Sequence, residues 1–351
     1  MRKLAVVLFN LGGPDAPDAV RPFLFNLFND GAIIGAPQPL RWLLAQMISR
    51  RRAPVAREIY AHLGGKSPLL ELTEAQAAAL QSVLGADTDY DVRVFVCMRY
   101  WHPMSDDVAA AVKSFAPDEV VLLPLYPQFS TTTSGSSLAD WRRAAAKAGL
   151  DAPTHSVCCY PLEQGWIEAQ ADLVGQAIER AGPNTRVLFS AHGLPKKIVA
   201  GGDPYQWQVE QTAAAVVDRL GGLSDWTVCY QSRVGPLEWI GPATEDELGR
   251  AASDGVGVII VPIAFVSEHS ETLVELDIEY REEAEKLGVK SYERVPAVGT
   301  HPAFIKGLAG RVRAVQDNPT HQPFGGSEGL RLCPATLGQC PCAAGATEAA
   351  E

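Results

Sequence analysis

A histidine that follows an apolar run is the first residue of this sequence that could do chemistry. It lies in the segment SAHGLP at 190–195, after the run 186–190, which we expect to be a buried strand. At the carboxyl end of such a strand, His192 is better placed to face a ligand than to fill the core. Imidazole accepts a proton or binds a metal ion near neutral pH, so His192 is a candidate catalytic residue. The alternative is that it only fixes a turn.

A row of carboxylates follows the apolar run 256–263, in the segment SEHSETLVELDIEY at 267–280. At about 100° per residue, an α-helix here would carry one acidic stripe. The stripe consists of Glu268, Glu271, Glu275, Glu279 and Glu282. Like charges four residues apart repel, and Lys286 relieves only Glu282. We interpret the first turns as a ladder for cations or protons, to which His269 adds a nitrogen; a solvated helix face is the alternative.

Three other segments could contribute to a binding site. Trp239 stands on a Gly/Pro-bracketed loop at 231–242, where its ring could lie against a flat ligand or pack in the core. The Phe- and Leu-rich segment 26–48 precedes three arginines at 50–52 and could form a lip for a greasy anionic substrate, touch a membrane surface, or form core helices. The hydroxyl-rich run 130–137 could bind an anion or only cap a helix. A G-x-G-x-x-G or P-loop pattern after a strand is missing, which disfavours nucleotide binding.

Composition excludes several classes of protein. Of the 351 residues, 47% are hydrophobic, which argues against disorder. Acidic residues outnumber basic ones by 41 to 30, and the formal charge of −11 disfavours nucleic-acid binding. The longest nearly unbroken apolar stretch, 256–266, is far shorter than the roughly 20 residues of a membrane helix. We expect a cytoplasmic protein whose 7 cysteines stay reduced and act as ligands, nucleophiles or core residues.

Strand and helix patterns alternate along the chain, which is typical of a parallel α/β fold. The expected strands are 4–10, 93–97, 119–125, 186–190, 226–230 and 256–263. The expected helices include 73–84, 105–114, 137–148, 166–181 and 205–220. Similar segments recur in the same order in both halves: VLFNLGGP with VLFSAHGLP, CMRYWHP with CYQSRVGP, and VVLLP with VIIVP. We therefore expect two similar Rossmann-like, doubly wound domains, with a ligand cleft between them at the carboxyl ends of the strands.

The expected domains are 1–165, which includes the lip segment, and 166–316. A third segment, the tail 317–351, is rich in Pro, Gly, Ala and Thr and contains Cys333, Cys340 and Cys342. A loose segment with clustered thiols needs something to hold it.

Seven of these segments together resemble the ferrochelatase family, whose members insert ferrous iron into a porphyrin. They are LFNLGGPD at 8–15, RRAPVAREIYAHLGGKSP at 51–68, MRYWHP at 98–103, PLYPQFSTTTSGSS at 124–137, FSAHGLP at 189–195, QSRVGPLEWIGP at 231–242 and SEHSETLVELDIEY at 267–280. The resemblance runs from about residue 4 to about residue 315. It implies a chelatase-like fold of two domains, with the porphyrin held in the cleft between them.

The resemblance also implies roles for single residues. His192 and Glu271 match the catalytic pair at the site of Fe²⁺ insertion, where we expect them to face each other across a slot wide enough for the ring. The residues expected to bind substrate are Leu11, Arg52, Tyr60, Ser67, Arg99, Tyr100, Trp239, His269, Glu275 and Glu279. A basic position of the animal enzymes is Val55 here, so recognition of the propionates could differ.

The tail cysteines match those relatives that carry a [2Fe-2S] cluster. Animal-type enzymes take their fourth ligand near the position of Thr131, which cannot ligate iron through sulfur. We expect Cys158, Cys333, Cys340 and Cys342 to hold the cluster, with Cys159 a close substitute for Cys158. A zinc site or an unligated tail is the alternative.

The resemblance therefore predicts a lyase that inserts Fe²⁺ into protoporphyrin IX. A coproporphyrin ferrochelatase and a cobalt or sirohaem-type chelatase are the nearest alternatives, ahead of a non-catalytic tetrapyrrole or metal carrier and an iron–sulfur electron carrier. The expected partners are a porphyrin and ferrous iron, without nucleic acid. Contact with the inner membrane as a peripheral protein stays open, as does the choice between monomer and homodimer.

Overall fold

The computed structural model describes residues 2–86, 90–233, 235, 237–317 and 331–342 of the chain. The described residues separate into two units. The first holds those up to Tyr126, Ser130–Cys158 and the chain from Ala309 to residue 317, and the second holds Pro127–Phe129, Cys159–Leu308 and the tail residues 331–342. The main change from one unit to the other therefore lies at Cys158–Cys159. Within the described residues the chain also changes unit at Tyr126–Pro127, Phe129–Ser130 and Leu308–Ala309. Of the expected tail 317–351, residues 318–330 and 343–351 lie outside the described residues.

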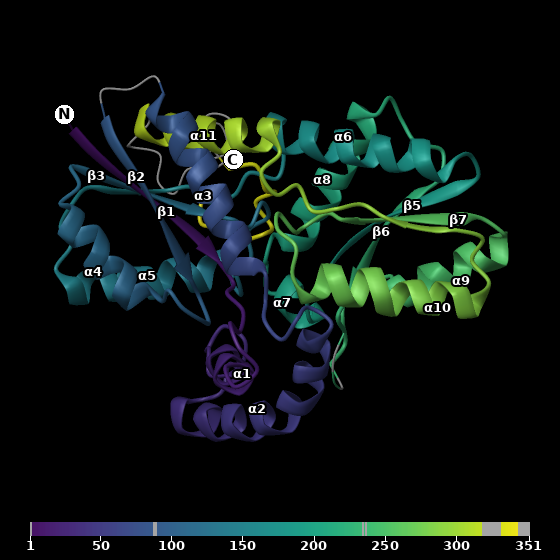
Figure 1. Ribbon diagram of the computed structural model, residues 1–351, viewed down its shortest axis with the longest axis horizontal. Coiled ribbons are helices and arrows are strands. Elements are labelled where there is room, and N and C mark those ends of the chain that lie inside the picture. The colour runs from purple at the N-terminus through teal and green to yellow at the C-terminus, as the bar shows by residue number, and fades with distance from the viewer. Residues whose placement is uncertain (1, 87–89, 234, 236, 318–330, 343–351) are drawn as a thin grey trace. The chain divides into compact units, whose positions relative to one another are not determined.

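The first unit is built on a parallel sheet with the strand order β2-β1-β3-β4. Its strands are β1 (Arg2–Asn10), β2 (Tyr90–Met98), β3 (Glu119–Pro124) and β4 (Thr154–Ser156). Its helices are α1 (Val20–Phe28), α2 (Gln38–Ala61), α3 (Leu69–Gly85), α4 (Ser105–Phe115) and α5 (Ser134–Ala148). Helices α4 and α5 cover one face of the sheet and α3 lies on the other, while α1 and α2 pack together apart from these layers (Figure 1). Phe9 of β1 meets Trp141 of α5 edge to face at 5.8 Å in the core.

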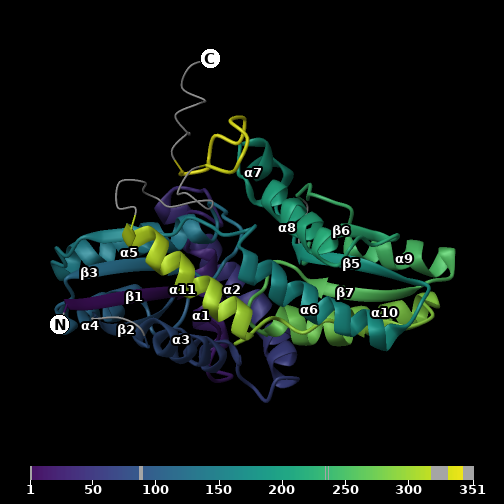
Figure 2. The ribbon, with the colours of Figure 1, turned by 90° about the horizontal axis from the view of Figure 1, so that it is seen from above.

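The second unit repeats this design with the parallel order β6-β5-β7-β8. Its strands are β5 (Thr185–His192), β6 (Trp226–Gln231), β7 (Gly257–Pro262) and β8 (Tyr292–Arg294). Its helices are α6 (Gln164–Ala181), α7 (Lys196–Ala200), α8 (Tyr205–Arg219), α9 (Thr244–Asp254), the π-helix η1 (Glu271–Glu279), α10 (Tyr280–Leu287) and the first half of α11 (Pro302–Asp317). Helices α9 and α10 cover one face of the sheet, and α6 and α8 the other (Figures 1 and 2).

The repeated segments of the sequence fall on equivalent strands of the two sheets. They lie on β1 and β5, on β2 and β6, and on β3 and β7, and each pair occupies the same place in its strand order. The expected fold of two similar doubly wound α/β units is therefore confirmed. The three-residue strands β4 and β8, each at a sheet edge, were not predicted because so short a segment shows no periodicity.

Among the described residues, none of the helices combines the length and apolar character that crossing a membrane requires.

Candidate active site

His192 is the last residue of β5, the second unit's strand between β6 and β7, and it is paired with a carboxylate. Its Nδ1 lies 2.9 Å from Oε2 of Glu271, the first residue of η1. The two side chains keep 40% and 26% of their surface exposed, so solvent or a substrate can reach the pair. The turn after the strand is tightly packed at Gly193, where a Cβ would lie 3.0 Å from the carbonyl oxygen of Gln231 and 3.4 Å from the ring of Trp239.

This geometry corrects the expectation that His192 and Glu271 face each other across a slot. A flat ring between two groups needs about 3.5 Å on each side, or roughly 7 Å in total. At 2.9 Å the two side chains are in direct hydrogen-bond contact and no ring fits between them. Any porphyrin must therefore meet both groups from the same side.

The pair perturbs the acid–base properties of both members. Burial lowers the pKa of His192, but the charge of Glu271 and the hydrogen bond to it outweigh burial and raise this pKa above its ordinary value. Burial raises the pKa of Glu271, but the charge of His192 outweighs it and holds this pKa well below its usual range. A proton arriving at the pair therefore resides on the imidazole.

A second carboxylate, Glu275, lies one turn further along η1. It accepts hydrogen bonds from the backbone N–H of Ser232 at 2.8 Å, from the Ser232 hydroxyl, and from Nε2 of Gln231 at 3.1 Å. Ser232 has a φ of 60°, the left-handed region that non-glycine residues rarely adopt. Burial and the charge of Glu271 raise the pKa of Glu275 to about 6. This carboxylate can therefore take up a proton near neutral pH.

The helix that carries these carboxylates is not the α-helix that we expected. Residues Glu271–Glu279 form a π-helix, in which the N–H of Tyr280 donates to the carbonyl oxygen of Glu275, five residues back, and an α-helix begins only at Tyr280. The expected pair of Glu282 with Lys286 is present, at 3.8 Å.

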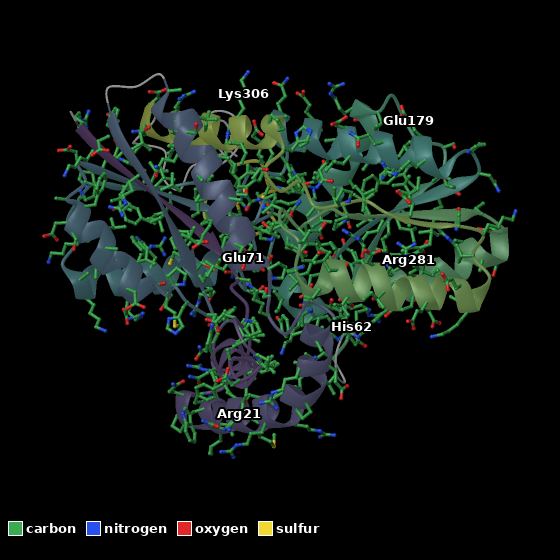
Figure 3. The ribbon with its side chains drawn as sticks, viewed as in Figure 1. Arg21, His62, Glu71, Glu179, Arg281 and Lys306 are labelled. Carbon is green, nitrogen blue, oxygen red and sulfur yellow. The ribbon has the colours of Figure 1, made fainter. Side chains whose placement is uncertain are left out.

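Two arginines form ion pairs with other carboxylates of this segment, so fewer of them are available to a cation or a proton. Glu268 forms an ion pair of 2.9 Å with Arg294 of β8. Asp277 pairs with Arg281 of α10 at 2.7 Å and with Arg294 at 3.3 Å (Arg281 is labelled in Figure 3). Glu279 is exposed. Of the carboxylates in the expected ladder, Glu271 and Glu275 are the ones whose charges act on His192 in the described structure.

His269 is buried and contacts the backbone at the start of η1. Its Nδ1 lies 3.4 Å from the backbone nitrogen of Thr272, and its ring meets Phe265 edge to face at 4.7 Å. Burial lowers the pKa of His269, so it is a neutral imidazole near pH 7.

Trp239 lies against the loop that follows His192. It forms an isolated β-bridge with Pro195, and the flanking Ile240 N–H donates to the carbonyl oxygen of Leu194 at 3.0 Å. Its indole Nε1 is buried and has no hydrogen-bond partner among the described residues. Val234 and Pro236, from the same segment, lie outside the described residues.

Two residues beside the pair were missed by sequence reasoning. Ser232 holds Glu275, and Tyr205, at the start of α8, hydrogen-bonds the backbone of His192. Burial, with the charge of Glu271, raises the pKa of Tyr205 far above its usual value. Neither residue stands in a pattern that distinguishes it from ordinary polar or core residues, so the sequence offered no signal.

The remaining substrate-binding candidates belong to the first unit. Leu11 packs against the apolar cluster of α1 and α2, Tyr60 is buried in that cluster, and Arg52 is exposed with its guanidinium 5.8 Å from the Phe28 ring. The backbone nitrogen of Ser67 donates to the carbonyl oxygen of Pro14 at 2.8 Å.

Arg99 and Tyr100 share the carboxylate of Asp30. The Arg99 guanidinium lies 2.9 Å from it, and the buried Tyr100 hydroxyl donates to it at 2.7 Å. Arg99 also lines a cavity of about 350 Å³ together with Asp140 and Arg143.

The tail residues 331–342 lie beside α7 and α8 of the second unit (Figure 2). The N–H of Gln339 donates to the carbonyl oxygen of Gly202 at 3.0 Å. Gly202 has a φ of 95°, and a Cβ there would lie 2.9 Å from the backbone nitrogen of Gly338. The tail and the loop before α8 therefore fit closely only because position 202 is glycine.

The tail thiols are buried near Cys159. Nε2 of Gln208 lies 3.0 Å from Sγ of Cys333 and 3.4 Å from Sγ of Cys159. A hydrogen bond with Cys340 and burial raise the pKa of Cys333 far above its usual value. Cys340 and Cys342 are also buried. Within the described chain, no group of three or more His, Cys, Asp or Glu side chains is already arranged to hold a metal ion.

The fold is that of the metal chelatases. The chain is similar to SirB from Bacillus subtilis solved with Fe³⁺ (TM-score 0.53, 13% identity, covering 91% of this chain and 97% of that one). It is also similar to a sirohydrochlorin chelatase SirB from Bacillus subtilis subspecies spizizenii in complex with cobalt (TM-score 0.52, 12% identity, covering 90% and 97%). At such low identity these likenesses show the fold alone.

The sequence comparisons identify the family. Residues 3–316 match the family described as Ferrochelatase. Curated proteins named ferrochelatase from Caulobacter vibrioides strain NA1000 and Phenylobacterium zucineum are 56% and 54% identical to the chain, covering 99% and 98% of it and 99% of each relative. The chain belongs to the ferrochelatase family. The protein is therefore an enzyme, a metal chelatase, as the motifs predicted.

Proposed function

We propose that the protein inserts Fe²⁺ into protoporphyrin IX at the His192–Glu271 pair and releases two protons. The observation that carries the proposal is the 2.9 Å contact between these side chains at the end of β5, with both still partly open to solvent. A carrier of tetrapyrrole or metal needs no proton acceptor, whereas metal insertion does, because the two pyrrole N–H protons must leave as Fe²⁺ enters.

The hydrogen bond supports a separate role for each imidazole nitrogen. With Nδ1–H donating to Glu271, Nε2 of the neutral ring keeps its lone pair and accepts a pyrrole proton. The carboxylate stabilises the imidazolium that forms, in keeping with the raised pKa of His192. Glu275, with a pKa of about 6, then serves as the next group that can take the proton. Both carboxylates also suit hydrated Fe²⁺ as it approaches.

Side chains of the first unit are proposed to recognise the substrate. Arg52, Tyr60 and Ser67 bind the propionates, Leu11 contacts the ring, and Arg99 lines the pocket. In the second unit, Trp239 lies against the ring.

An anaerobic assay with Fe²⁺ and three tetrapyrroles tests this function. We expect rapid loss of porphyrin fluorescence with protoporphyrin IX and slower loss with coproporphyrin. If coproporphyrin is consumed faster, coproporphyrin and not protoporphyrin IX is the substrate. If the protein inserts cobalt into sirohydrochlorin but inserts Fe²⁺ into neither porphyrin, it is a chelatase of the cobalt or sirohaem type.

We further propose that the tail carries a [2Fe-2S] cluster. Four thiolates are the donors such a cluster requires, and buried thiols of the second unit supply that donor type. Cys333 is hydrogen-bonded to Cys340, and Gln208 bonds both Cys333 and Cys159. These contacts favour Cys159 over Cys158 as the internal ligand, with Cys342 as the fourth. Visible absorption of the purified protein tests this, because a zinc site or an unligated tail is colourless in the visible range.

Helix α2 is the proposed site of peripheral membrane contact. The exposed apolar side chains in its first half are Leu40 (52% exposed), Trp42 (46%), Leu43 (58%) and Met47 (59%). They precede the arginines at 50–52, so one helix combines an apolar surface with positive charge. In a flotation assay with anionic vesicles, the wild type should float with the vesicles, and a variant with Leu43→Ser and Met47→Ser should not. Equal flotation of both proteins would refute membrane contact through α2.

A further inference from the structure

A buried glutamine lies between two of the proposed cluster ligands. Gln208 is in the first turn of α8, and none of its surface is exposed. Its Nε2 atom lies 3.0 Å from Sγ of Cys333 and 3.4 Å from Sγ of Cys159. A side-chain amide nitrogen carries two protons, one for each sulfur. The two cysteines are 174 residues apart in the chain, so this one side chain joins the tail to the body of the unit.

The orientation of the amide is fixed from its other end. Oε1 of Gln208 accepts a hydrogen bond of 2.7 Å from the backbone N–H of Phe129. Rotating the amide by half a turn would direct the carbonyl oxygen at both sulfurs and leave the Phe129 N–H facing an NH₂ group. Buried donors and acceptors are costly to leave unpaired, so the NH₂ group stays on the sulfurs.

The surroundings hold this arrangement in place. Thr212, one turn further along α8, donates to the carbonyl oxygen of Pro161, two residues after Cys159. Nε2 of Gln128 donates to the same hydroxyl at 3.1 Å. The N–H of Tyr160 donates to the carbonyl oxygen of Pro127 at 2.8 Å. The segments 127–129 and 159–161 are thus hydrogen-bonded to each other and to α8, which gives Gln208 a rigid position.

We propose that Gln208 is a positioning residue of the iron–sulfur site: its amide donates N–H···S hydrogen bonds to the thiolates of Cys159 and Cys333 and thereby raises the reduction potential of the cluster. The inference rests on the proposed [2Fe-2S] cluster. Hydrogen bonds to the sulfurs are one of the determinants of cluster potential. Donors near the sulfurs stabilise negative charge, and the reduced cluster carries one more negative charge than the oxidised one. Removing them should favour the oxidised form.

The test compares two variants of the full-length protein as isolated. Gln208→Leu removes the donors with little change of volume. Gln208→Glu keeps an oxygen for the Phe129 N–H but turns a carboxylate towards the sulfurs. The matched control is Gln170→Leu on α6, because Gln170 is also fully buried in this unit and its amide makes no hydrogen bond among the described residues. Redox titration followed by visible absorption gives the potential, the EPR spectrum of the reduced state reports the electronic structure, and thermal melting reports folding.

We expect a more negative potential and altered EPR g values in Gln208→Leu, a larger negative shift or easier loss of the cluster in Gln208→Glu, and wild-type values in Gln170→Leu. Wild-type potential and spectrum in both Gln208 variants would overturn the inference, while the cluster itself would stand. Failure of both variants to fold would give Gln208 a packing role only and would equally overturn it. A wild-type protein without visible absorption would instead remove the cluster on which the inference rests.

Discussion

Replacing His192 by alanine separates the chemistry of the site from its contribution to folding. Loss of a positioned proton acceptor should reduce kcat/KM for iron insertion by about 10²- to 10⁴-fold, or about 3–5 kcal/mol in activation free energy. The folded state should lose little, because the side chain is 40% exposed and Glu271, left unpaired, is 26% exposed and can be hydrated. One hydrogen bond is worth about 1 kcal/mol, which corresponds to about 2–4 °C in melting temperature for a unit of this size.

A second histidine–carboxylate pair in the same unit provides the control. Nε2 of His301 lies 3.1 Å from Oδ2 of Asp172, so His301→Ala removes a similar contact. Both variants are compared with the wild type in a continuous fluorescence assay with Fe²⁺ and protoporphyrin, and in a thermal melt. Similar melting temperatures with activity lost only in His192→Ala is the expected pattern. Near-normal turnover in His192→Ala, or equal loss of activity in both variants, would refute the assignment of His192 as proton acceptor.

Three further predictions concern the second unit. Since the charge of Glu275 raises the pKa of His192, Glu275→Gln should lower that pKa and move the acid limb of the kcat/KM profile to lower pH; a shift to higher pH would contradict the coupling. Cys340→Ser should abolish the visible absorption of the purified protein, whereas Cys229→Ala, at a thiol of the sheet core, should leave it unchanged. Gly202→Ala should displace the tail, because its Cβ would lie 2.9 Å from the Gly338 nitrogen, and bleach the protein without unfolding it; a fully coloured variant would show that the tail adapts.

The strand pattern could be predicted from the sequence because fully buried parallel strands are almost entirely apolar. All of β7, for example, is buried. The edge strands β4 and β8 escaped prediction because three residues show no period. The π-helix was not predicted because the acidic segment was analysed with the period of an α-helix. Its residue types are compatible with either kind of helix. Separation along the chain also gives no distance, so the direct contact of His192 with Glu271 could not be foreseen.

The polar partners of the site were the hardest to predict. Arg294 neutralises Glu268 from a strand that lies 26 residues further along the chain, so no pattern within the acidic segment reveals it. Cys158 and Cys159 are adjacent and identical in type, so the sequence cannot show that Gln208 contacts the thiol of Cys159. Nothing in the sequence distinguishes Ser232 from other serines. Its φ of 60° and its hydrogen bond to Glu275 are visible only in the structure.

The repeated sheet places two strand ends at equivalent positions, and their chemistry differs. When β1 is aligned with β5 by their shared Val-Leu-Phe run, Gly12 is the counterpart of His192. Gly12 has a φ of 84° and lies in a tight turn where a Cβ would approach the Trp101 nitrogen at 3.0 Å, so this copy has no room for an imidazole. The two equivalent strand ends therefore differ in chemistry: one presents an ionisable side chain, and the other is a close-packed glycine turn.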